Sequence, residues 1–134
     1  MKYFLAFLSS FCLLIACNHS NEAIKQRIAD SDSVAINYFK GDGTIDTVAA
    51  VKIIRDKKKI EQLAALISSE TIESKPNCGY DGSLHFFKID KVTQDIDFRL
   101  NNDQCRYFSF MQQGKIQSTV LSNEAKELIN SFRK

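Results

Sequence analysis

The chain has 134 residues, of which 18 are Lys or Arg and 16 are Asp or Glu, giving a formal net charge of +2 at pH 7. This length suits one domain, and the near-neutral charge gives no electrostatic basis for binding nucleic acid, so no nucleic-acid partner is predicted. One proline and five glycines, beside 44% hydrophobic residues, argue against a low-complexity or disordered chain.

The N-terminal 17 residues are typical of an export signal. A short segment with the single charge of Lys2 precedes an apolar run at 4–16, which is short for a transmembrane helix and suits a signal peptide. The run ends in Leu14-Ile15-Ala16-Cys17, which resembles the lipobox of bacterial lipoproteins. We therefore expect a lipoprotein signal peptide at 1–16, cleaved before Cys17. An uncleaved anchor helix and an ordinary secretory peptide are the alternatives.

The lipobox implies that lipid on the thiol of Cys17 holds the protein to a bacterial membrane, with its domain outside the cytoplasm. Several acyl chains anchor durably, at about 0.8 kcal/mol for each buried CH₂ group. Asn18 follows the cysteine, so the aspartate that retains lipoproteins at the inner membrane in some bacteria is missing. The choice between inner and outer membrane stays open.

The four cysteines divide by location. Cys12 leaves with the signal peptide and Cys17 takes lipid, so Cys78 and Cys105 remain as a pair in an oxidising compartment. Such a pair most simply forms a disulfide, while a metal site and a catalytic thiol are alternatives. The pair lacks Cys-x-x-Cys spacing and His85 is the one histidine beyond the tether, so no metal and no cofactor are predicted.

Hydrophobic periodicity predicts an α+β domain at 32–134, after a lipidated tether with a short helix at 17–31. Its mostly antiparallel sheet of about six strands is packed by two helices, in the order ββαββββα. Asp56 and Ser122 are expected to cap the two helices. The expected elements are strands 34–39 and 47–54, a helix at 57–69, strands 83–89, 92–100, 105–112 and 116–121, and a helix at 123–132.

The clearest alternation lies in the strand at 92–100. Even-numbered apolar residues are expected to share the buried face, and odd-numbered polar residues the solvent face. Asp95 and Asp97 form a close carboxylate pair there, which would suit glycosidase chemistry or a cation. Because Arg99 lies on the same face, a charged solvent face is the favoured interpretation. The apolar set is Val92, Ile96, Phe98 and Leu100, and the polar set is Thr93, Asp95, Asp97 and Arg99.

Residues 45–132 also carry a recognisable series of short patterns. It comprises Ile53-Ile54-Arg55-Asp56-Lys57 entering a helix, Cys78-Gly79-Tyr80-Asp81-Gly82, Cys105, a Gly114-Lys115 turn and Leu121-Ser122 before Glu124-Ala125. This series resembles small bacterial lipoproteins. The resemblance implies a lipoprotein without an assigned activity, so it transfers no functional residues.

No catalytic motif is present, and no catalytic residues are predicted. The best candidate binding face is formed by Tyr80, Asp81 and His85, near Cys78. A histidine beside a glycine turn can act as a base or ligand, or it can be a half-buried strand residue hydrogen-bonded to a neighbour.

These observations favour a non-enzymatic, lipid-anchored cell-envelope protein that binds another envelope component, such as a protein. One alternative is an inhibitor-type lipoprotein that blocks lysozyme-like enzymes, which has this size and location. The other is a small enzyme that uses His85.

Overall fold

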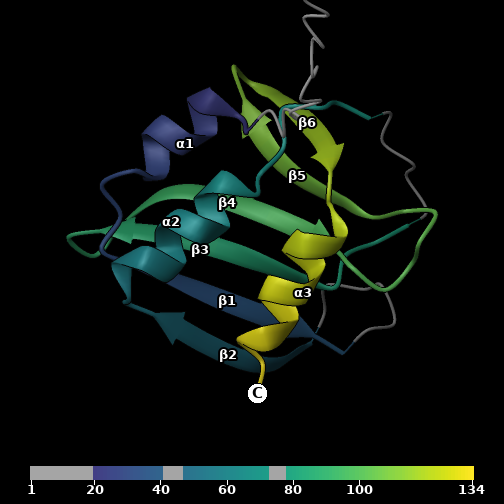
Figure 1. The fold of residues 1–134 in the computed structure, drawn as a ribbon, viewed down its shortest axis with the longest axis horizontal. Helices are drawn as coiled ribbons and strands as arrows, with labels where there is room; N and C mark the ends of the chain where they lie inside the picture. Colours follow the sequence, from purple (N-terminus) through teal and green to yellow (C-terminus); the bar gives the residue numbers. More distant parts are fainter. Residues whose placement is uncertain (1–19, 41–46, 73–77) are drawn as a thin grey trace, which may run out of the picture.

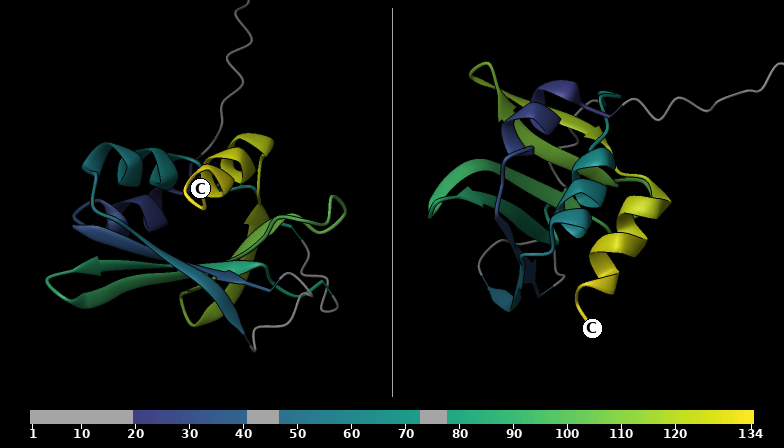
Figure 2. Two further views of the ribbon diagram at one scale, coloured as in Figure 1. Left: turned by 90° about the horizontal axis from the view of Figure 1, so that it is seen from below. Right: turned by 60° about the vertical axis from the view of Figure 1, so that its left-hand side comes forward.

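The computed structural model describes residues 20–40, 47–72 and 78–134. They form one antiparallel sheet of strand order β2-β1-β3-β4-β5-β6, with three helices on one of its faces (Figure 1, Figure 2). The predicted α+β class is confirmed. The elements are α1 (Glu22–Ile28), β1 (Ser33–Phe39), β2 (Val48–Ile54), α2 (Lys57–Ala65), β3 (Gly82–Lys88), β4 (Lys91–Arg99), β5 (Tyr107–Gln112), β6 (Lys115–Val120) and α3 (Asn123–Ser131).

The eight predicted elements occur in the predicted order, and both predicted N-caps are present. The Asp56 carboxylate accepts from the Lys58 backbone N–H at 2.9 Å, and the Ser122 hydroxyl accepts from the Ala125 N–H at 3.1 Å. The lipobox with Cys17 lies outside the described residues, so the structure does not bear on it. None of the helices in the described ranges is long and apolar enough to cross a membrane.

The short helix α1 belongs to the packed domain. Ile24 and Ile28 are 0% and 1% exposed and join the main core cluster. The Asn21 side chain caps α1, while its backbone N–H donates to the Ile67 carbonyl at 2.8 Å. Folded structure therefore begins by Ser20, ahead of the expected domain start at 32.

A row of residues across the middle of the sheet forms the centre of the core. Gly82 lies between Tyr38 of β1 and Phe98 of β4, and the Tyr38 and Phe98 rings make an edge contact at 6.3 Å. The Tyr38 hydroxyl donates to the Ile129 carbonyl at 2.6 Å, which fastens α3 to the sheet. Burial raises the pKa of Tyr38 to about 12.

The prediction that Val92 lies on the buried face of its strand is wrong. Pairing between β3 and β4 shifts by one residue, so that Phe86 opposes Gln94 whereas Phe87 opposes Val92. A β-bulge of this kind changes the face of the residues beyond it. Gln94 remains on the helix side with Ile96 and is buried, whereas Val92, beyond the bulge, points away from the helices and is 49% exposed.

The predicted disulfide between Cys78 and Cys105 is present, with the two Cα atoms 5.9 Å apart. It joins the segment before β3 to the segment before β5. Both cysteines pack with Tyr107 in a small second cluster, and the Tyr107 hydroxyl donates to the Gly79 carbonyl at 2.7 Å. The segment that leads into β3 is thus tied to the sheet by a covalent bond and a hydrogen bond.

Candidate functional site

The sheet face opposite the helices is the setting of the candidate site, and we call it the open face. Figure 2 shows all three helices on the other side of the sheet. The strand register places polar side chains in the middle of the open face and apolar ones toward both edges. Its members include Val51, Ile53, Asn37, Ser83, His85, Val92, Asp95, Asp97, Tyr107, Ser109, Met111 and Ile116.

His85 is the centre of a hydrogen-bonded group on the open face. The register places it opposite Asp95, and the His85 Nδ1 lies 2.6 Å from the Asp95 Oδ1. The His85 Nε2 lies 2.8 Å from the Ser83 hydroxyl and 3.1 Å from the Asn37 amide nitrogen. When Nδ1–H donates to the Asp95 carboxylate, Nε2 is free to accept from Ser83 or Asn37.

The series Ser83–His85–Asp95 has the hydrogen-bond order of a serine hydrolase triad. Unlike the serine of such a triad, Ser83 is hardly accessible to a substrate. It is only 4% exposed and lies in a central strand between Asn37 and Asp97. A nucleophile must reach the substrate carbonyl, and a hydroxyl enclosed in a sheet does not. This geometry suits a structural hydrogen-bond chain.

The three predicted binding-face residues occupy different environments. Asp81 is 4% exposed, and its carboxylate accepts from Arg99 at 2.8 Å and from the backbone N–H groups of Leu100 and Asn101 at 2.6 and 2.9 Å. Such full pairing of a buried carboxylate holds the end of β4 in place. Tyr80 is half-buried against Tyr107, with ring centroids 5.8 Å apart.

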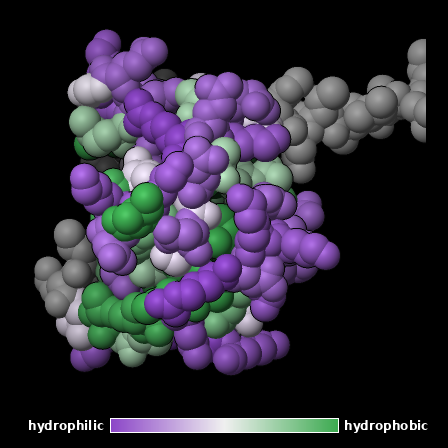
Figure 3. All heavy atoms as spheres, turned by 90° about the vertical axis from the view of Figure 1, so that its left-hand side faces the viewer, coloured by the Kyte–Doolittle hydropathy of each residue, from purple (hydrophilic) through white to green (hydrophobic). Residues whose placement is uncertain are grey.

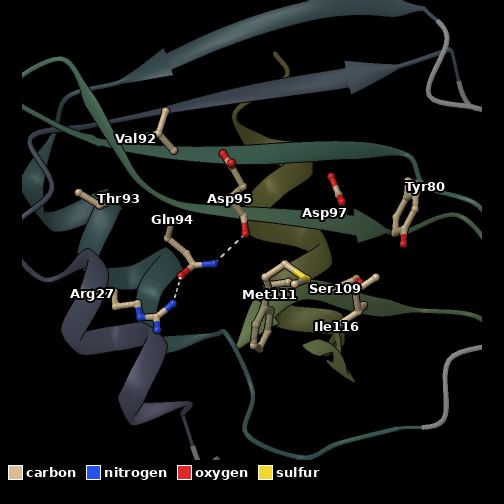
Figure 4. Close-up of a pocket in the computed structure, with 11 residues that line it drawn as sticks. Arg27, Tyr80, Val92, Thr93, Gln94, Asp95, Asp97, Ser109, Met111 and Ile116 are labelled. Carbon is tan, nitrogen blue, oxygen red and sulfur yellow. Dashed lines mark hydrogen bonds between the residues drawn. The ribbon is translucent and has the colours of Figure 1, made fainter. Parts of the chain in front are cut away.

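A pocket of about 370 Å³ opens where β4 and β5 separate. The two strands pair only from Asp97 to Arg99, opposite Ser109 to Tyr107, and diverge beyond that point. The Gln94 amide donates to the Asp95 carbonyl at 2.9 Å and accepts from Arg27 of α1 at 3.2 Å, as Figure 4 shows. The lining residues are Arg27, Tyr80, Val92, Thr93, Gln94, Asp95, Asp97, Ser109, Phe110, Met111 and Ile116.

The pocket joins a carboxylate wall to an apolar rim. Asp95 and Asp97 supply the carboxylates, while Val92, Met111 and Ile116 supply the rim and are 49%, 52% and 68% exposed. Arg27 is the one basic side chain among the lining residues, and its guanidinium is bound to Gln94. A cationic group beside an apolar one would complement this lining.

Asp97 is the chemically distinctive member of the pocket. Its carboxylate is half-buried and, within the described residues, takes part in no hydrogen bond or ion pair. Burial raises the pKa of Asp97; proximity to His85 lowers it, and the Asp95 charge raises it again. A half-buried carboxylate without a partner is costly in the free protein and favours a ligand that supplies a positive charge.

The sequence pattern identified part of this site. It selected Tyr80 and His85, which lie at the pocket and beside it, and it considered the carboxylate pair of Asp95 and Asp97 but favoured a charged solvent face for them. It did not identify Arg27 or Ile116, which come from α1 and from the hairpin of β5 and β6. In the described part of the chain no group of three or more His, Cys, Asp or Glu side chains is arranged to hold a metal ion.

No family model, no curated protein and no solved structure matches this chain. Functional inference therefore depends on the residues and their geometry.

We expect Asp97→Asn to stabilise the protein at neutral pH. Burial raises the pKa of Asp97 in the folded protein above its unfolded value of about 3.9. Its contribution to the free energy of unfolding is therefore fully present below that unfolded value and is lost as the pH rises through the folded-state pKa. The amide removes the cost of the buried charge. Urea unfolding should give a higher midpoint for the variant at pH 7 and equal midpoints at pH 3.

The matched control is Asp90→Asn, which changes an exposed carboxylate in the turn between β3 and β4. Asn tolerates the positive φ of 61° at that position, so this variant should follow the unsubstituted protein at both pH values. A lower midpoint for Asp97→Asn at pH 7 would show that the carboxylate has a stabilising partner.

Proposed function

We propose that the protein is a lipid-anchored component of the bacterial cell envelope that binds a partner protein at the pocket between β4 and β5. The observation that carries the binding proposal is the unpaired, half-buried carboxylate of Asp97 beside the exposed apolar side chains of Met111 and Ile116. The partner segment that fits this lining presents a lysine or arginine side chain next to apolar residues.

The proposed anchor is compatible with an accessible pocket. Ser20 forms a bridge with Ser68 after α2, so the chain enters the fold within the helix layer. Three Cα-to-Cα steps separate Cys17 from Ser20 and span at most about 11 Å. Lipid on Cys17 would therefore hold the helix side of the domain close to the membrane and leave the open face directed away from it.

The pocket offers affinity through three kinds of contact. A buried charge-assisted hydrogen bond to Asp97 contributes about 1.5–3 kcal/mol. Burial of apolar surface on Val92, Met111 and Ile116 adds about 25 cal/mol for each Å² removed from water. Tyr80 places an aromatic ring at the same pocket, and aromatic rings attract cations.

We expect Cys17→Ser to abolish membrane attachment. A serine at this position has no thiol to accept lipid, so the chain should appear as a soluble or unprocessed species when cell fractions are separated. A Cys12→Ser chain is the matched control, because that residue would leave with the signal peptide. A Cys17→Ser chain of mature size that remains with the membrane would refute the lipid anchor.

We expect partner capture to depend on Asp97. A photoreactive benzoylphenylalanine at Ile116 should cross-link a partner protein in intact cells, whereas the same group at Gln62 on α2 should not. Asp97→Asn should lower the yield about tenfold, because losing one charge-assisted hydrogen bond of about 1.5 kcal/mol weakens binding by that factor. Asp90→Asn should leave the yield unchanged, and equal yields from the two variants would refute the site.

The hydrogen-bonded series Ser83–His85–Asp95 favours one second candidate, a small hydrolase that uses His85 as its base. The burial of Ser83 supports the binding function over this one. We expect no covalent labelling by a fluorophosphonate probe under native conditions. Labelling that disappears in a Ser83→Ala chain would replace the binding proposal with a hydrolase.

A further inference from the structure

A second cavity, of about 260 Å³, lies in the helix layer between the end of α1 and the start of α2, and we call it the α1–α2 cavity. The two helices run antiparallel. Ser20, before α1, forms a bridge with Ser68, after α2, whereas Ala29 and Lys57 line the cavity at the other end of the pair. None of the residues that line the pocket between β4 and β5 lines this cavity.

The floor of the α1–α2 cavity is apolar. Ile28 and Ile60 are 1% and 3% exposed and belong to the main core, so they form a fixed surface. Ala29 and Ala64 line the same space, and their methyl groups are too short to fill it. Ligand cavities usually measure about 300–1,000 Å³. The α1–α2 cavity is smaller, so it suits one narrow chain better than a ring system.

The rim of the α1–α2 cavity is basic. Lys25 comes from the last turn of α1 and Lys57 from the first turn of α2. Lys57 forms no ion pair with any described residue, and Lys25 has one contact, at 3.9 Å, with the exposed carboxylate of Glu22. Glu61 is the one acid in the lining. Two ammonium groups can therefore approach an anion that lies above the apolar floor.

The start of α2 adds further positive charge beside the cavity. Lys57, Lys58 and Lys59 are consecutive and exposed, and the first turn contains no acid. These cations lie at the positive end of the helix dipole, where anions are favoured. The Asp56 carboxylate before them already accepts from the Lys58 and Lys59 backbone N–H groups. Figure 3 faces the end of the molecule at which α2 begins, and most of that end is hydrophilic. An anionic ligand would offset the repulsion among these lysines.

We propose that the α1–α2 cavity binds the chain of a fatty acid, with its hydrocarbon on Ile28 and Ile60 and its carboxylate between Lys25 and Lys57. The basic rim selects an anionic head, and the small apolar floor selects a single unbranched chain. A membrane phospholipid has two chains, and the floor has room for one. Each CH₂ group that enters the cavity should tighten binding about fourfold, from about 0.8 kcal/mol of transfer free energy. This site depends neither on lipid at Cys17 nor on the pocket between β4 and β5.

A photoreactive fatty acid tests the cavity in the full-length, membrane-associated protein. The protein is placed in phosphatidylcholine vesicles, and a dodecanoic acid with a diazirine near its methyl end is added and irradiated. We expect mass spectrometry to find the label on residues 28–31 and 60–64. Unlabelled dodecanoate should compete with the probe, whereas dodecyltrimethylammonium, which has the same chain and the opposite charge, should not.

Substitutions separate the charge of the rim from the space above the floor. Lys57→Gln should lower labelling about fivefold, because one lysine beside an anionic head contributes about 1 kcal/mol. Lys115→Gln is the matched control, since Lys115 is an exposed lysine of β6 outside the lining, and it should label as the unsubstituted protein does. Ala64→Leu places a larger side chain in the cavity and should abolish the label.

Four results would overturn the proposal. They are a label spread over the whole surface, equal competition by the two amphiphiles, equal labelling of Lys57→Gln and Lys115→Gln, and loss of the label when phosphatidylglycerol replaces phosphatidylcholine. The last result would assign the cavity to a membrane phospholipid. Because Lys57 is exposed at the start of α2, its substitution spares the core, so the test remains decisive if Ala64→Leu fails to fold.

Discussion

The close approach of Phe98 to Gly82 is the contact on which the rest of the fold depends. A Cβ atom at Gly82 would lie 2.2 Å from the Asn37 carbonyl oxygen and 2.3 Å from the Phe98 ring. The missing side chain allows the ring to cover the start of β3 and to meet Tyr38. Tyr38 in turn binds the Ile129 carbonyl, so one glycine positions three central strands and the last helix together.

The hydrophobic pattern predicted the elements because one face of the sheet is buried. Elimination predicted the disulfide, since Cys78 and Cys105 were the two cysteines left once Cys12 and Cys17 were assigned to the expected signal peptide and lipidation site. The pattern failed where pairing decides the outcome. Val92 changes face because of a bulge, which periodicity does not contain. The turn falls at Ile89 and Asp90, with φ of 48° and 61°, although a β-branched residue rarely adopts positive φ.

At the candidate site, too, local sequence spacing predicted which residues share a strand face but not which residues pair across strands. The alternating charges Asp95, Asp97 and Arg99 indicated a solvated strand face, and the sequence does not say how they pair. In the folded sheet, Arg99 pairs with the buried carboxylate of Asp81, and His85 pairs with Asp95. As a result of those two pairings, Asp97 forms no hydrogen bond or ion pair with any described residue. Local spacing contains neither pairing, because each joins β4 to β3 or the segment before it.

The half-buried charge of Asp97 reduces the stability of the isolated domain at neutral pH, because burial raises the pKa of this carboxyl. The disulfide and the fully paired carboxylate of Asp81 stabilise the sheet around them. A partner that binds only the folded state adds its binding free energy to folding. Occupying the pocket would therefore raise stability in proportion to the surface and charge that the partner covers.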